Sequence, residues 1–377
     1  MPIKIFVILI MAKGWIRKTT KKFFIIVNAI IVLFFLIAAL SPYVNPNQIW
    51  FHGLLALTTP YLILALILFT LFWLISKPIW SLMPIIALLI GWQQIAVVFA
   101  WTGNSIFTKR KAENHFRIVN WNVQSFNGLS KDALAKKLVR NEVASSILKT
   151  YPDVICLQEF NNAEAENNIS LFRSTHQYYF FSKDHKRNDG TYQSGCIIFS
   201  KYPIIDSGRV VFPSEESLIY TDLLKGNDTI RVFTTHLQSF KFKKKDYADI
   251  EKIKDSDESS FSASLSIMRK MKAAYQKRGI QANLVRTALD RSPYPTVITG
   301  DFNDVPNSYT YFNIKGDKND AFLQRSFGLG RTFISLAPTL RIDYILLDRQ
   351  FEVKQFDMVD EALSDHIMLV ADIRLKK

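Results

Sequence analysis

Apolar residues are distributed unevenly along this chain of 377 residues. The N-terminal part contains three long apolar runs, at 23–40, 54–75 and 79–101. A membrane-spanning helix needs roughly 20 predominantly apolar residues. Between residues 23 and 101 the only charged side chain is Lys77, and only Gln93 and Gln94 interrupt the third run. Rather than a buried helical hairpin of a globular domain, we expect three transmembrane helices, at about 23–42, 54–76 and 79–101.

The basic residues of this part indicate its orientation. Residues 1–101 contain seven Lys and Arg and no Asp or Glu, and six of the seven lie in the tail 1–22. Basic segments stay on the cytoplasmic side, so this tail is predicted to be cytoplasmic. Three crossings then place the rest of the chain outside the cytoplasm, on the periplasmic side of the inner membrane. A basic cluster at 109–111 argues against this side, and a re-entrant third run would return the chain to the cytoplasm. Met11 is an alternative start, because most of the basic tail follows it.

The rest of the chain has the composition of a soluble domain. Residues 102–377 hold 40 of the 47 Lys and Arg and all 33 Asp and Glu, a net charge of +7. This split excludes a disordered chain and also a single soluble domain. After a linker at 102–113, two stretches have helical spacing, at 134–148 and at 262–289, the second with Lys and Arg expected on its solvent face. Short runs rich in β-branched residues predict strands at 116–122, 154–158, 196–200, 230–236, 296–299, 342–347 and 367–373.

Two cysteines, Cys156 and Cys196, each lie in one of these apolar strand runs. Buried free thiols are the expected state. One disulfide between neighbouring strands is the alternative outside the cytoplasm. Two cysteines do not identify the compartment.

Polar residues suited to catalysis lie at the ends of the predicted strands. Side chains at strand ends project into loops and can converge at one edge of a sheet. Each motif alone also fits an ordinary turn or cap, so only their combination supports a site. The candidate residues are Asn122, Glu159, His236, Asp301, Asn303, Asp343, Asp365 and His366.

These residue types suit the hydrolysis of a phosphate ester by water. Glu159, Asn122 and Asp365 offer hard oxygen ligands, which suit Mg²⁺, or alternatively Mn²⁺, better than Zn²⁺. Asp301 could orient or deprotonate an attacking water. The sequence contains no Gly-x-Ser-x-Gly elbow, so direct attack by water fits better than a covalent nucleophile.

The remaining candidates suit a phosphoryl group that gains negative charge. His366 beside a carboxylate partner would be favoured as a cation and could meet a phosphate oxygen. Asn303 and His236 could donate hydrogen bonds to the developing charge. A phosphate ester is therefore the predicted substrate.

Six motifs, in this order along the chain, resemble those of the endonuclease/exonuclease/phosphatase superfamily: Asn-Trp-Asn-Val, Leu-Gln-Glu, Thr-His-Leu, Gly-Asp-Phe-Asn, Arg-Ile-Asp-Tyr and Ser-Asp-His. The superfamily includes pancreatic deoxyribonuclease, abasic-site endonucleases, neutral sphingomyelinases and inositol polyphosphate 5-phosphatases. The resemblance covers about residues 114–375. It implies an α/β fold, a four-layered sandwich of two packed mixed β-sheets flanked by helices, in a catalytic domain at 114–377. The chain looks like a membrane-anchored, bacterial-type member.

The resemblance also implies a divalent-metal site on Glu159 and Asn122, with Asp365 contributing, and a water-activating base at Asp301. In one respect the chain departs from part of the family. Some abasic-site enzymes carry a metal-binding Asp two residues after the first Asn, where this chain has Gln124. This departure weakens the abasic-site interpretation and leaves the implied mechanism intact.

Four further roles are implied by the same resemblance. His366, oriented by Asp343, would stabilise the transition state. Asn303 would hold the phosphate, and His236 would contact the scissile phosphate. All four residue types are present at the matching positions.

We therefore predict a membrane-anchored, metal-dependent phosphoesterase that hydrolyses phosphodiester, nuclease-like bonds. The +7 balance of residues 102–377 favours nucleic acid, while the basic segment 241–245 fits either a solvated loop, a phosphate-rich polymer or an anionic membrane surface. A phospholipid or sphingolipid headgroup is the alternative substrate, because the anchor would hold the site beside a bilayer. A catalytically inactive scaffold is less consistent with the sequence, since Glu159, Asp301 and His366 are all present. A transporter is excluded because the predicted spans contain no Asp, Glu, Lys or Arg. No protein partner can be inferred.

Overall fold

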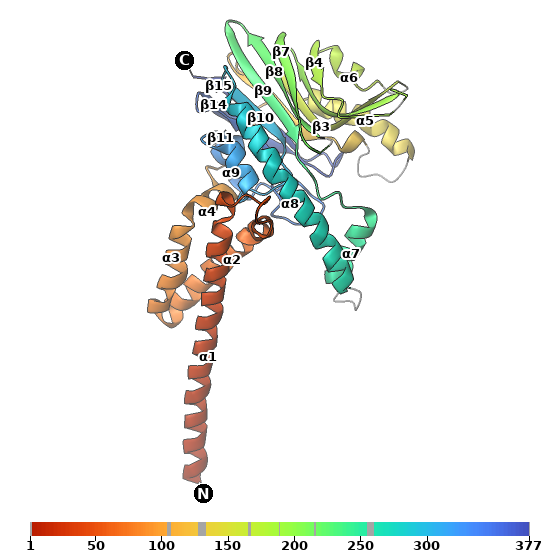
Figure 1. The fold of residues 1–377 in the computed structure, drawn as a ribbon. Helices are drawn as coiled ribbons and strands as arrows, with labels where there is room; N and C mark the ends of the chain where they lie inside the picture. Colours follow the sequence, from red (N-terminus) through yellow and green to blue (C-terminus); the bar gives the residue numbers. More distant parts are fainter. Residues whose placement is uncertain are drawn as a thin grey trace.

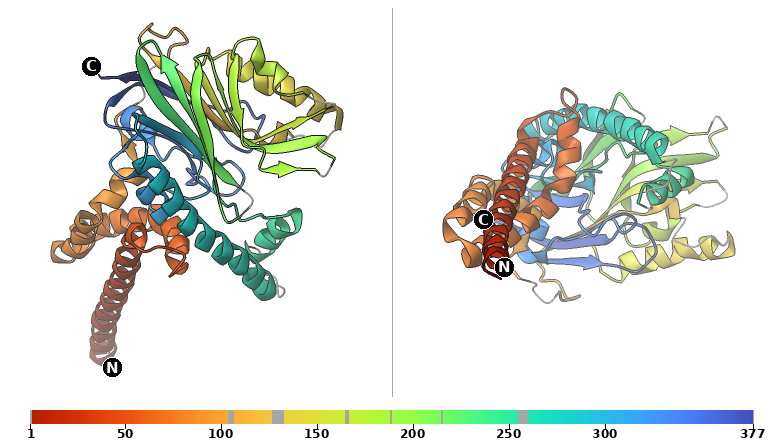
Figure 2. Two further views of the ribbon diagram at one scale, coloured as in Figure 1. Left: turned by 45° about the horizontal axis from the view of Figure 1, so that its top comes forward. Right: turned by 90° about the horizontal axis from the view of Figure 1, so that it is seen from below.

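The fold was obtained as a computed structural model, which describes residues 2–103, 107–126, 133–164, 167–187, 189–214, 216–254 and 260–376. A β-rich body carries the C-terminus on one side (Figure 1). The N-terminal helices gather on the opposite side of this body, and α1 projects away from it (Figures 1 and 2). Two sheets make up most of the body.

The first sheet has seven strands, in the order β14-β15-β2-β3-β6-β4 with β5 paired to β6. Strands β2 and β3 are parallel, and the other neighbours are antiparallel. Every residue of β2 is buried, including the polar Arg117, Asn120 and Asn122. The strands are β2 (Phe116–Asn122), β3 (Val154–Ala163), β4 (Tyr178–Phe181), β5 (His185–Lys186), β6 (Tyr192–Ser200), β14 (Phe351–Val359) and β15 (Met368–Leu375).

The second sheet has six strands, in the order β11-β13-β10-β9-β8-β7. Here β9 and β10 are the parallel pair. A separate two-stranded pair joins β1 (Ala100–Trp101) to β12 (Phe327–Gly328). The strands of the six-stranded sheet are β7 (Ile204–Val211), β8 (Ser217–Lys225), β9 (Asp228–His236), β10 (Thr296–Asp301), β11 (Asn319–Asp320) and β13 (Asp343–Leu347).

Three buried apolar layers hold the body together. Between the sheets, residues such as Ile118 and Ile198 pack against Val232 and Val297 of the other sheet. The outer face of the first sheet packs against α5 (Ala133–Leu148), with α6 (Ser170–Arg173) beside it. The outer face of the second packs against α8 (Ser260–Asp290) and α9 (Tyr309–Lys315), and α10 (Ala321–Arg325) contacts the inter-sheet core. The predicted four-layered α/β sandwich of two mixed sheets is confirmed.

The apolar runs located the central strands well and the edge strands poorly. All seven expected strands are present, although β6 and β9 start earlier and β15 begins at Met368. Eight of the described strands were not expected: the edge strands β4, β7, β11 and β14, the two-residue strands β1, β5 and β12, and the interior strand β8. The outermost strand β7 is half-exposed or exposed along its whole length, so it has no apolar run to reveal it. Residues 244–254, which had no expected element, form α7 (Lys244–Lys254), and 255–259 lie outside the described residues.

Two N-terminal helices are long and apolar enough to cross a membrane. The candidate span Arg17–Tyr43 runs from within α1 (Pro2–Ala39) to the end of the following 3-10 helix, and α2 (Phe51–Ser76) is the second. Helix α1 also includes most of the predicted basic tail. The short 3-10 helices are η1 (Ser41–Tyr43) and η2 (Pro78–Ser81) in this part, and η3 (Gln124–Phe126) after β2.

The third apolar run does not form the straight helix that was expected. The segments Pro78–Ile90, which includes α3 (Leu82–Ile90), and α4 (Trp92–Val98) meet at an angle of 69°. At the bend, Gly91 lies against the ring of Phe35, where a Cβ would come within 2.4 Å. Gln94 is buried, and its Nε2 is satisfied by a hydrogen bond of 3.1 Å to the Ala39 carbonyl of α1. The protein thus has two candidate spans, or three if the bent pair is counted as one.

Both cysteines are buried and free, on the neighbouring strands β3 and β6. Burial raises the pKa of Cys156 to about 12, and that of Cys196 well above its usual value. Such thiols are poor nucleophiles because the thiolate is the reactive form. Buried thiols, the expected state, are therefore what the structure contains, and the alternative disulfide is not formed.

One buried ion pair joins the neighbouring strands β2 and β15 of the first sheet. Arg117 on β2 donates from Nε and Nη2 to both carboxylate oxygens of Asp372 on β15, at 2.5 and 2.8 Å, and neither side chain is exposed. We expect Arg117→Met to lower the free energy of unfolding by about 3–5 kcal/mol, because it leaves a buried carboxylate without its counter-charge. Urea unfolding of the full chain in detergent would measure this. Arg117→Met with Asp372→Leu removes both charges and should cost clearly less; equal losses in the two variants would contradict the prediction.

Candidate functional site

The site lies where the two pairs of parallel strands end. Because parallel strands place their carboxyl ends at the same edge, β9 and β10 bring His236 and Asp301 level with each other. The antiparallel neighbour β13 begins at this edge, so Asp343 is also level with Asp301. In the other sheet, β2 ends at Asn122, level with Gln158 on β3.

Glu159 reaches the site through an irregularity in β3. The pairing of β3 with β6 shifts register between Leu157 and Phe160, and Glu159 has a positive φ of 51°. A β-bulge of this kind redirects a side chain that would otherwise follow the strand alternation. The side chain of Glu159 is 38% exposed, whereas its neighbours Gln158 and Phe160 are fully buried. The bulge therefore presents one carboxylate to the solvent at the edge of the sheet.

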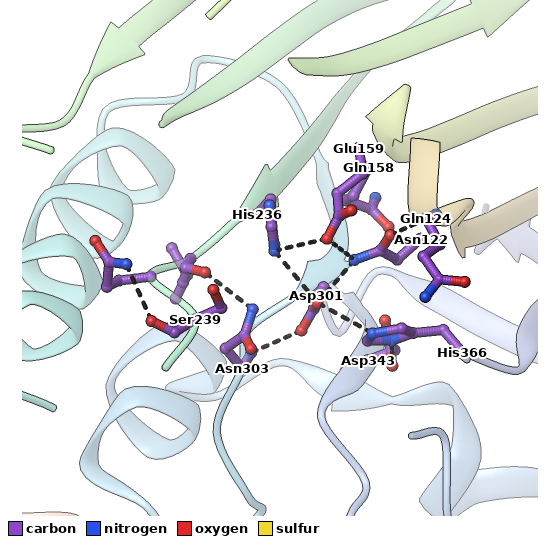
Figure 3. Close-up of polar contacts among 12 residues, drawn as sticks. Asn122, Gln124, Gln158, Glu159, His236, Ser239, Asp301, Asn303, Asp343 and His366 are labelled. Atoms are coloured by element: carbon purple, nitrogen blue, oxygen red, sulfur yellow. Dashed lines mark hydrogen bonds and ion pairs between the residues drawn. The ribbon is translucent and has the colours of Figure 1, made fainter. Parts of the chain in front are cut away.

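Asp301 stands at the centre of the site (Figure 3). Its Oδ1 accepts a hydrogen bond from the backbone N–H of Asn303 at 2.8 Å. Its Oδ2 accepts from Nδ2 of Asn122 at 3.1 Å. The same oxygen lies 3.5 Å from Nε2 of His236 and 3.7 Å from Nε2 of His366. With a side chain only 1% exposed, this carboxylate is held by donors from both sheets.

His366 is fixed from several directions. Its Nδ1 lies 2.9 Å from Oδ2 of Asp343, and its backbone carbonyl accepts from Nε1 of Trp121 at 2.8 Å. Ser364 Oγ accepts from the His366 N–H at 3.2 Å and donates to the Asn122 carbonyl at 2.7 Å. The ring is thereby oriented with Nε2 toward Asp301.

The charges of this cluster shift the pKa values of its members. Burial and the charge of Asp343 raise the pKa of Asp301 to about 6, against the opposing effect of His366 and His236. Burial works against protonation of His366, but the carboxylates of Asp343 and Asp301 prevail and raise its pKa to about 10. Burial also acts to lower the pKa of His236, but nearby carboxylates, chiefly that of Glu216, outweigh it and raise this pKa. At neutral pH the centre therefore holds a carboxylate at Asp301 beside an imidazolium at His366.

Asn303 and Asp304 follow β10 in the same turn. The Asn303 amide Nδ2 donates to the Leu237 carbonyl at 3.0 Å, which leaves its second N–H for another acceptor. Asn303 has a positive φ of 53°, a conformation that Asn tolerates better than most residues. The turn thus holds the amide at the wall of the site.

All eight residues expected from the sequence are brought together. Six of them line one cavity of about 180 Å³: Glu159, His236, Asp301, Asn303, Asp365 and His366. The other two lie behind it in contact with members of this set, Asn122 with Glu159 and Asp301, and Asp343 with His366. A set spread over 245 positions of the chain is therefore one site.

Glu159 and Asp365 fit a hard divalent cation best. Both line the cavity, and their side chains are 38% and 19% exposed. Burial, reinforced by the charge of Glu159, raises the pKa of Asp365, so the two carboxylates repel each other in the absence of a cation. Among the described residues, no donor reaches the buried Oε1 of Gln124, a further oxygen beside Asn122. The donors are all oxygens, as Mg²⁺ or Mn²⁺ prefers.

Two other candidate ligand arrangements fit a metal less well. Asp301, Asp343 and His366 bring ligand atoms within 4.8 Å of one another. A protonated His366 has no free ring lone pair, so this group is better described as a charge-paired histidine. Asn122 turns Nδ2 toward Glu159, 3.2 Å from Oε1, while its Oδ1 accepts from the Gln124 N–H at 3.0 Å. Asn122 would ligate a metal beside Glu159 only after its amide rotates by half a turn.

Some residues that support the site were not foreseen from the sequence. Thr332 Oγ1 accepts from the backbone N–H of Asp343 at 3.1 Å. Arg278 was expected on the solvent face of α8 with the other basic residues, and this was wrong. It is fully buried, with Nε 3.4 Å from Oδ2 of Asp304 and Nη1 donating to the Gln238 carbonyl at 2.9 Å. Helical periodicity could not reveal this, because the counter-charge on Asp304 is 26 positions away in the sequence.

A comparison with protein-family models finds two matches. The model described as "Endonuclease/Exonuclease/phosphatase family" matches residues 119–366, about two-thirds of the chain, and thus includes all eight site residues. The chain belongs to the endonuclease/exonuclease/phosphatase family. Membership makes it a hydrolase of phosphoric ester bonds, in a family whose members depend on a divalent metal. A domain of unknown function matches residues 21–98, the N-terminal helices.

Solved structures of family members are similar at low identity. A family protein of Beutenbergia cavernae has 18% identity and a TM-score of 0.47, over 70% of this chain and 72% of its own. TDP2 of D. rerio, solved with a single-strand DNA product, has 18% identity and a TM-score of 0.46, over 70% of this chain and 100% of its own. The human Nocturnin catalytic domain has 17% identity and a TM-score of 0.48, over 70% of this chain and 94% of its own. No curated protein sequence matches the chain. These identities are too low to transfer a substrate to this family member.

The pKa values of the site predict a bell-shaped dependence of hydrolysis on pH. Activity on bis(p-nitrophenyl) phosphate should fall below about pH 6 as Asp301 is protonated, and above about pH 10 as His366 loses its proton. Asp343→Asn removes the charge that raises the pKa of His366, so the alkaline limb should move to lower pH. The maximal rate should fall by ~10²-fold or more, because the ring is no longer held by a carboxylate. The exposed Asp228→Asn serves as control; an alkaline limb that stays in place in Asp343→Asn would contradict the assignment.

Proposed function

We propose that this family member is a membrane-anchored, Mg²⁺-dependent phosphodiester hydrolase that works by direct attack of water. One observation supports this most strongly. The carboxylate of Asp301 lies 3.7 Å from Nε2 of His366, in a cavity that two further carboxylates, Glu159 and Asp365, also line. A base, a cation and a pair of oxygen ligands thus surround one space.

In the proposed step, Asp301 Oδ2 takes a proton from the attacking water. The water oxygen forms a new bond to phosphorus as the bond from phosphorus to the leaving oxygen breaks. The leaving oxygen then takes up a proton from solvent. A pKa of about 6 keeps Asp301 ionised at neutral pH and still leaves it basic enough to accept the proton.

The other polar groups stabilise the charge that develops on the phosphoryl oxygens. His366 presents a protonated Nε2, and the free N–H of the Asn303 amide is available on the cavity wall. His236 lies on the other side of Asp301, with Nε2 3.8 Å from Oε1 of Glu159. Donors that are held in place before the reaction need no reorganisation, which is the main source of such stabilisation.

The divalent cation would be held by Glu159 and Asp365. When bound, it would supply positive charge to the phosphoryl and leaving oxygens. It would also relieve the repulsion between these two carboxylates. Mn²⁺ has the same oxygen preference and is the alternative ion.

The N-terminal helices support anchoring at a membrane. Helices α1 and α2 both have the length and apolarity of membrane spans. We propose the cell (inner) membrane as the location, with the hydrolase domain outside the cytoplasm if the bent pair α3–α4 also crosses. Two crossings would instead place this domain on the side of the N-terminus. Labelling of an introduced surface cysteine in intact cells by a membrane-impermeant thiol reagent distinguishes the two.

Asp301→Asn tests the proposed base. Replacing the carboxylate by an amide keeps its shape but leaves it unable to accept the proton, so kcat should fall by ~10²–10⁴-fold. The full chain in detergent, with Mg²⁺ and bis(p-nitrophenyl) phosphate, provides the measurement. Asp290→Asn changes an exposed carboxylate at the end of α8 and should leave the rate unchanged. An Asp301→Asn variant with the wild-type rate would overturn the proposed mechanism.

Glu159→Gln tests the proposed cation site. The variant loses one charged ligand and keeps a neutral oxygen, so we expect the Mg²⁺ concentration for half-maximal activity to rise. This Mg²⁺ concentration should rise at least ~10–100-fold, because even the loss of a group that only supports a metal ligand lowers metal affinity by that factor. Saturating Mg²⁺ should restore much of the rate. EDTA should abolish wild-type activity, and activity that persists in EDTA would argue against any metal.

A further inference from the structure

The cavity that contains the catalytic residues is only half polar. The rest of its lining, an apolar wall, is formed by side chains from separate parts of the chain. One segment follows β10 and contributes Val305, and a second precedes β13. The third is the helix α2, which contributes Leu57. The apolar residues of the second segment are Phe333, Leu336, Leu340 and Ile342.

Helix α2 is built into this wall. Ala56 is buried in a cluster with Val305 and Ile342, and Leu57 packs against the same cluster. The ring of Tyr275 on α8 lies over Gly53, where a Cβ would come within 2.3 Å. Only glycine permits this approach, so the start of α2 is fitted closely to the catalytic body.

Hydrogen bonds fix the same contact. Asn307, just after the catalytic turn, donates from Nδ2 to Thr59 Oγ1 of α2 at 2.8 Å and to the Ala38 carbonyl of α1 at 3.0 Å. Asn307, Thr59 and Ala38 are all buried, and Ala38 lies in the last turn of α1. The position of Leu57 in the cavity is therefore specified by packing and by polar contacts together.

The rim of the cavity is aromatic and carries one lysine. Phe240 stacks on Phe242 with ring centroids 5.2 Å apart, and Phe240 also meets the ring of Tyr275 at 5.4 Å. Lys241 is the one Lys or Arg among the described lining residues. A groove for a nucleic acid backbone requires several basic contacts along its length, and this cavity does not provide them.

The outside of the protein near this cavity suits a bilayer surface. Helix α7 and the adjoining half of α8 project from the body on the same side as the N-terminal helices (Figures 1 and 2). This arm exposes Leu265 and Met268, which are 39% and 40% accessible, near the exposed basic segment 243–245. Exposed apolar residues beside basic ones are typical of elements that rest on an anionic membrane surface.

Resting on the function proposed above, we propose that the substrate is an amphiphilic phosphodiester, presented by the membrane, whose apolar chain lies against Leu57 and the apolar wall. The phosphate would occupy the polar half of the cavity beside Asp301 and His366. The matched helical region of unknown function would then form part of the substrate site in addition to anchoring the chain. Without an apolar chain, this wall would leave exposed hydrophobic surface inside the active site.

The test compares two substrates with the same charge and leaving group. The full-length protein in one detergent is assayed with Mg²⁺ on p-nitrophenyl methyl phosphate and on p-nitrophenyl dodecyl phosphate. We expect kcat/KM to be at least tenfold higher for the dodecyl ester, because each buried CH₂ of the chain adds to binding. Leu57→Gln should reduce the dodecyl-to-methyl ratio at least tenfold, and Leu57→Met, which keeps an apolar side chain, should restore it. Partition of the dodecyl ester into micelles is the same for every variant in one detergent, so it cancels when the ratio of a variant is divided by that of the wild type.

Leu224→Gln, a substitution of an exposed leucine on β8, is the control and should leave both rates unchanged. A wild-type ratio near one, or a ratio that Leu57→Gln does not alter while the methyl ester is still hydrolysed, would overturn the amphiphile proposal and leave the hydrolase intact. Faster cleavage of a single-stranded DNA oligonucleotide than of the dodecyl ester would identify nucleic acid as the substrate instead. If neither ester nor DNA is hydrolysed, the proposed function itself fails.

Discussion

The buried carboxylate of Asp301 is the constraint on which the site depends. A carboxylate that is almost fully buried is stable as an anion only if donors and positive charge surround it. Here the donors come from both sheets, an amide from β2 and imidazoles from the end of β9 and from the segment before β15. The two parallel strand pairs must therefore end at one edge, and the sheets must pack with these edges aligned. The same proximity raises the pKa of His366 and keeps that of Asp301 close to neutrality.

Two departures from regular backbone geometry lie at that edge. Glu159 and Asn303 both have positive φ angles, and both are directed to the cavity. The bulge at Glu159 costs β3 part of its pairing with β6, but it moves one carboxylate from a buried strand to a half-exposed position. Irregular backbone at a functional edge of this kind is expected where geometry is set by the chemistry of the site rather than by the sheet.

The N-terminal helices and the hydrolase domain form one continuous structure around the cavity. If α1 to α4 were only an anchor, a flexible linker would be enough to connect them. Instead, Ala56 and Leu57 of α2 pack against residues that follow the catalytic strands β10 and precede β13. Asn307, in the same region, donates hydrogen bonds to both α1 and α2. The position of this edge relative to the two long apolar helices is thus determined by side-chain packing and hydrogen bonds.

Much of this fold follows from local sequence patterns. Long uncharged apolar runs predicted the helical N-terminal part, and runs rich in β-branched residues predicted most of the central strands. Six ordered motifs pointed to eight candidate residues that the fold brings together, although they lie as far apart as Asn122 and His366. Edge strands such as β7 could not be predicted, since a half-exposed strand has no distinctive periodicity. Only the tertiary structure decided that the third apolar run bends at Gly91, that Arg278 is buried against Asp304, and that Leu57 enters the cavity. Each of these depends on contacts between residues distant in the chain, whereas hydropathy and spacing record only what neighbouring residues have in common.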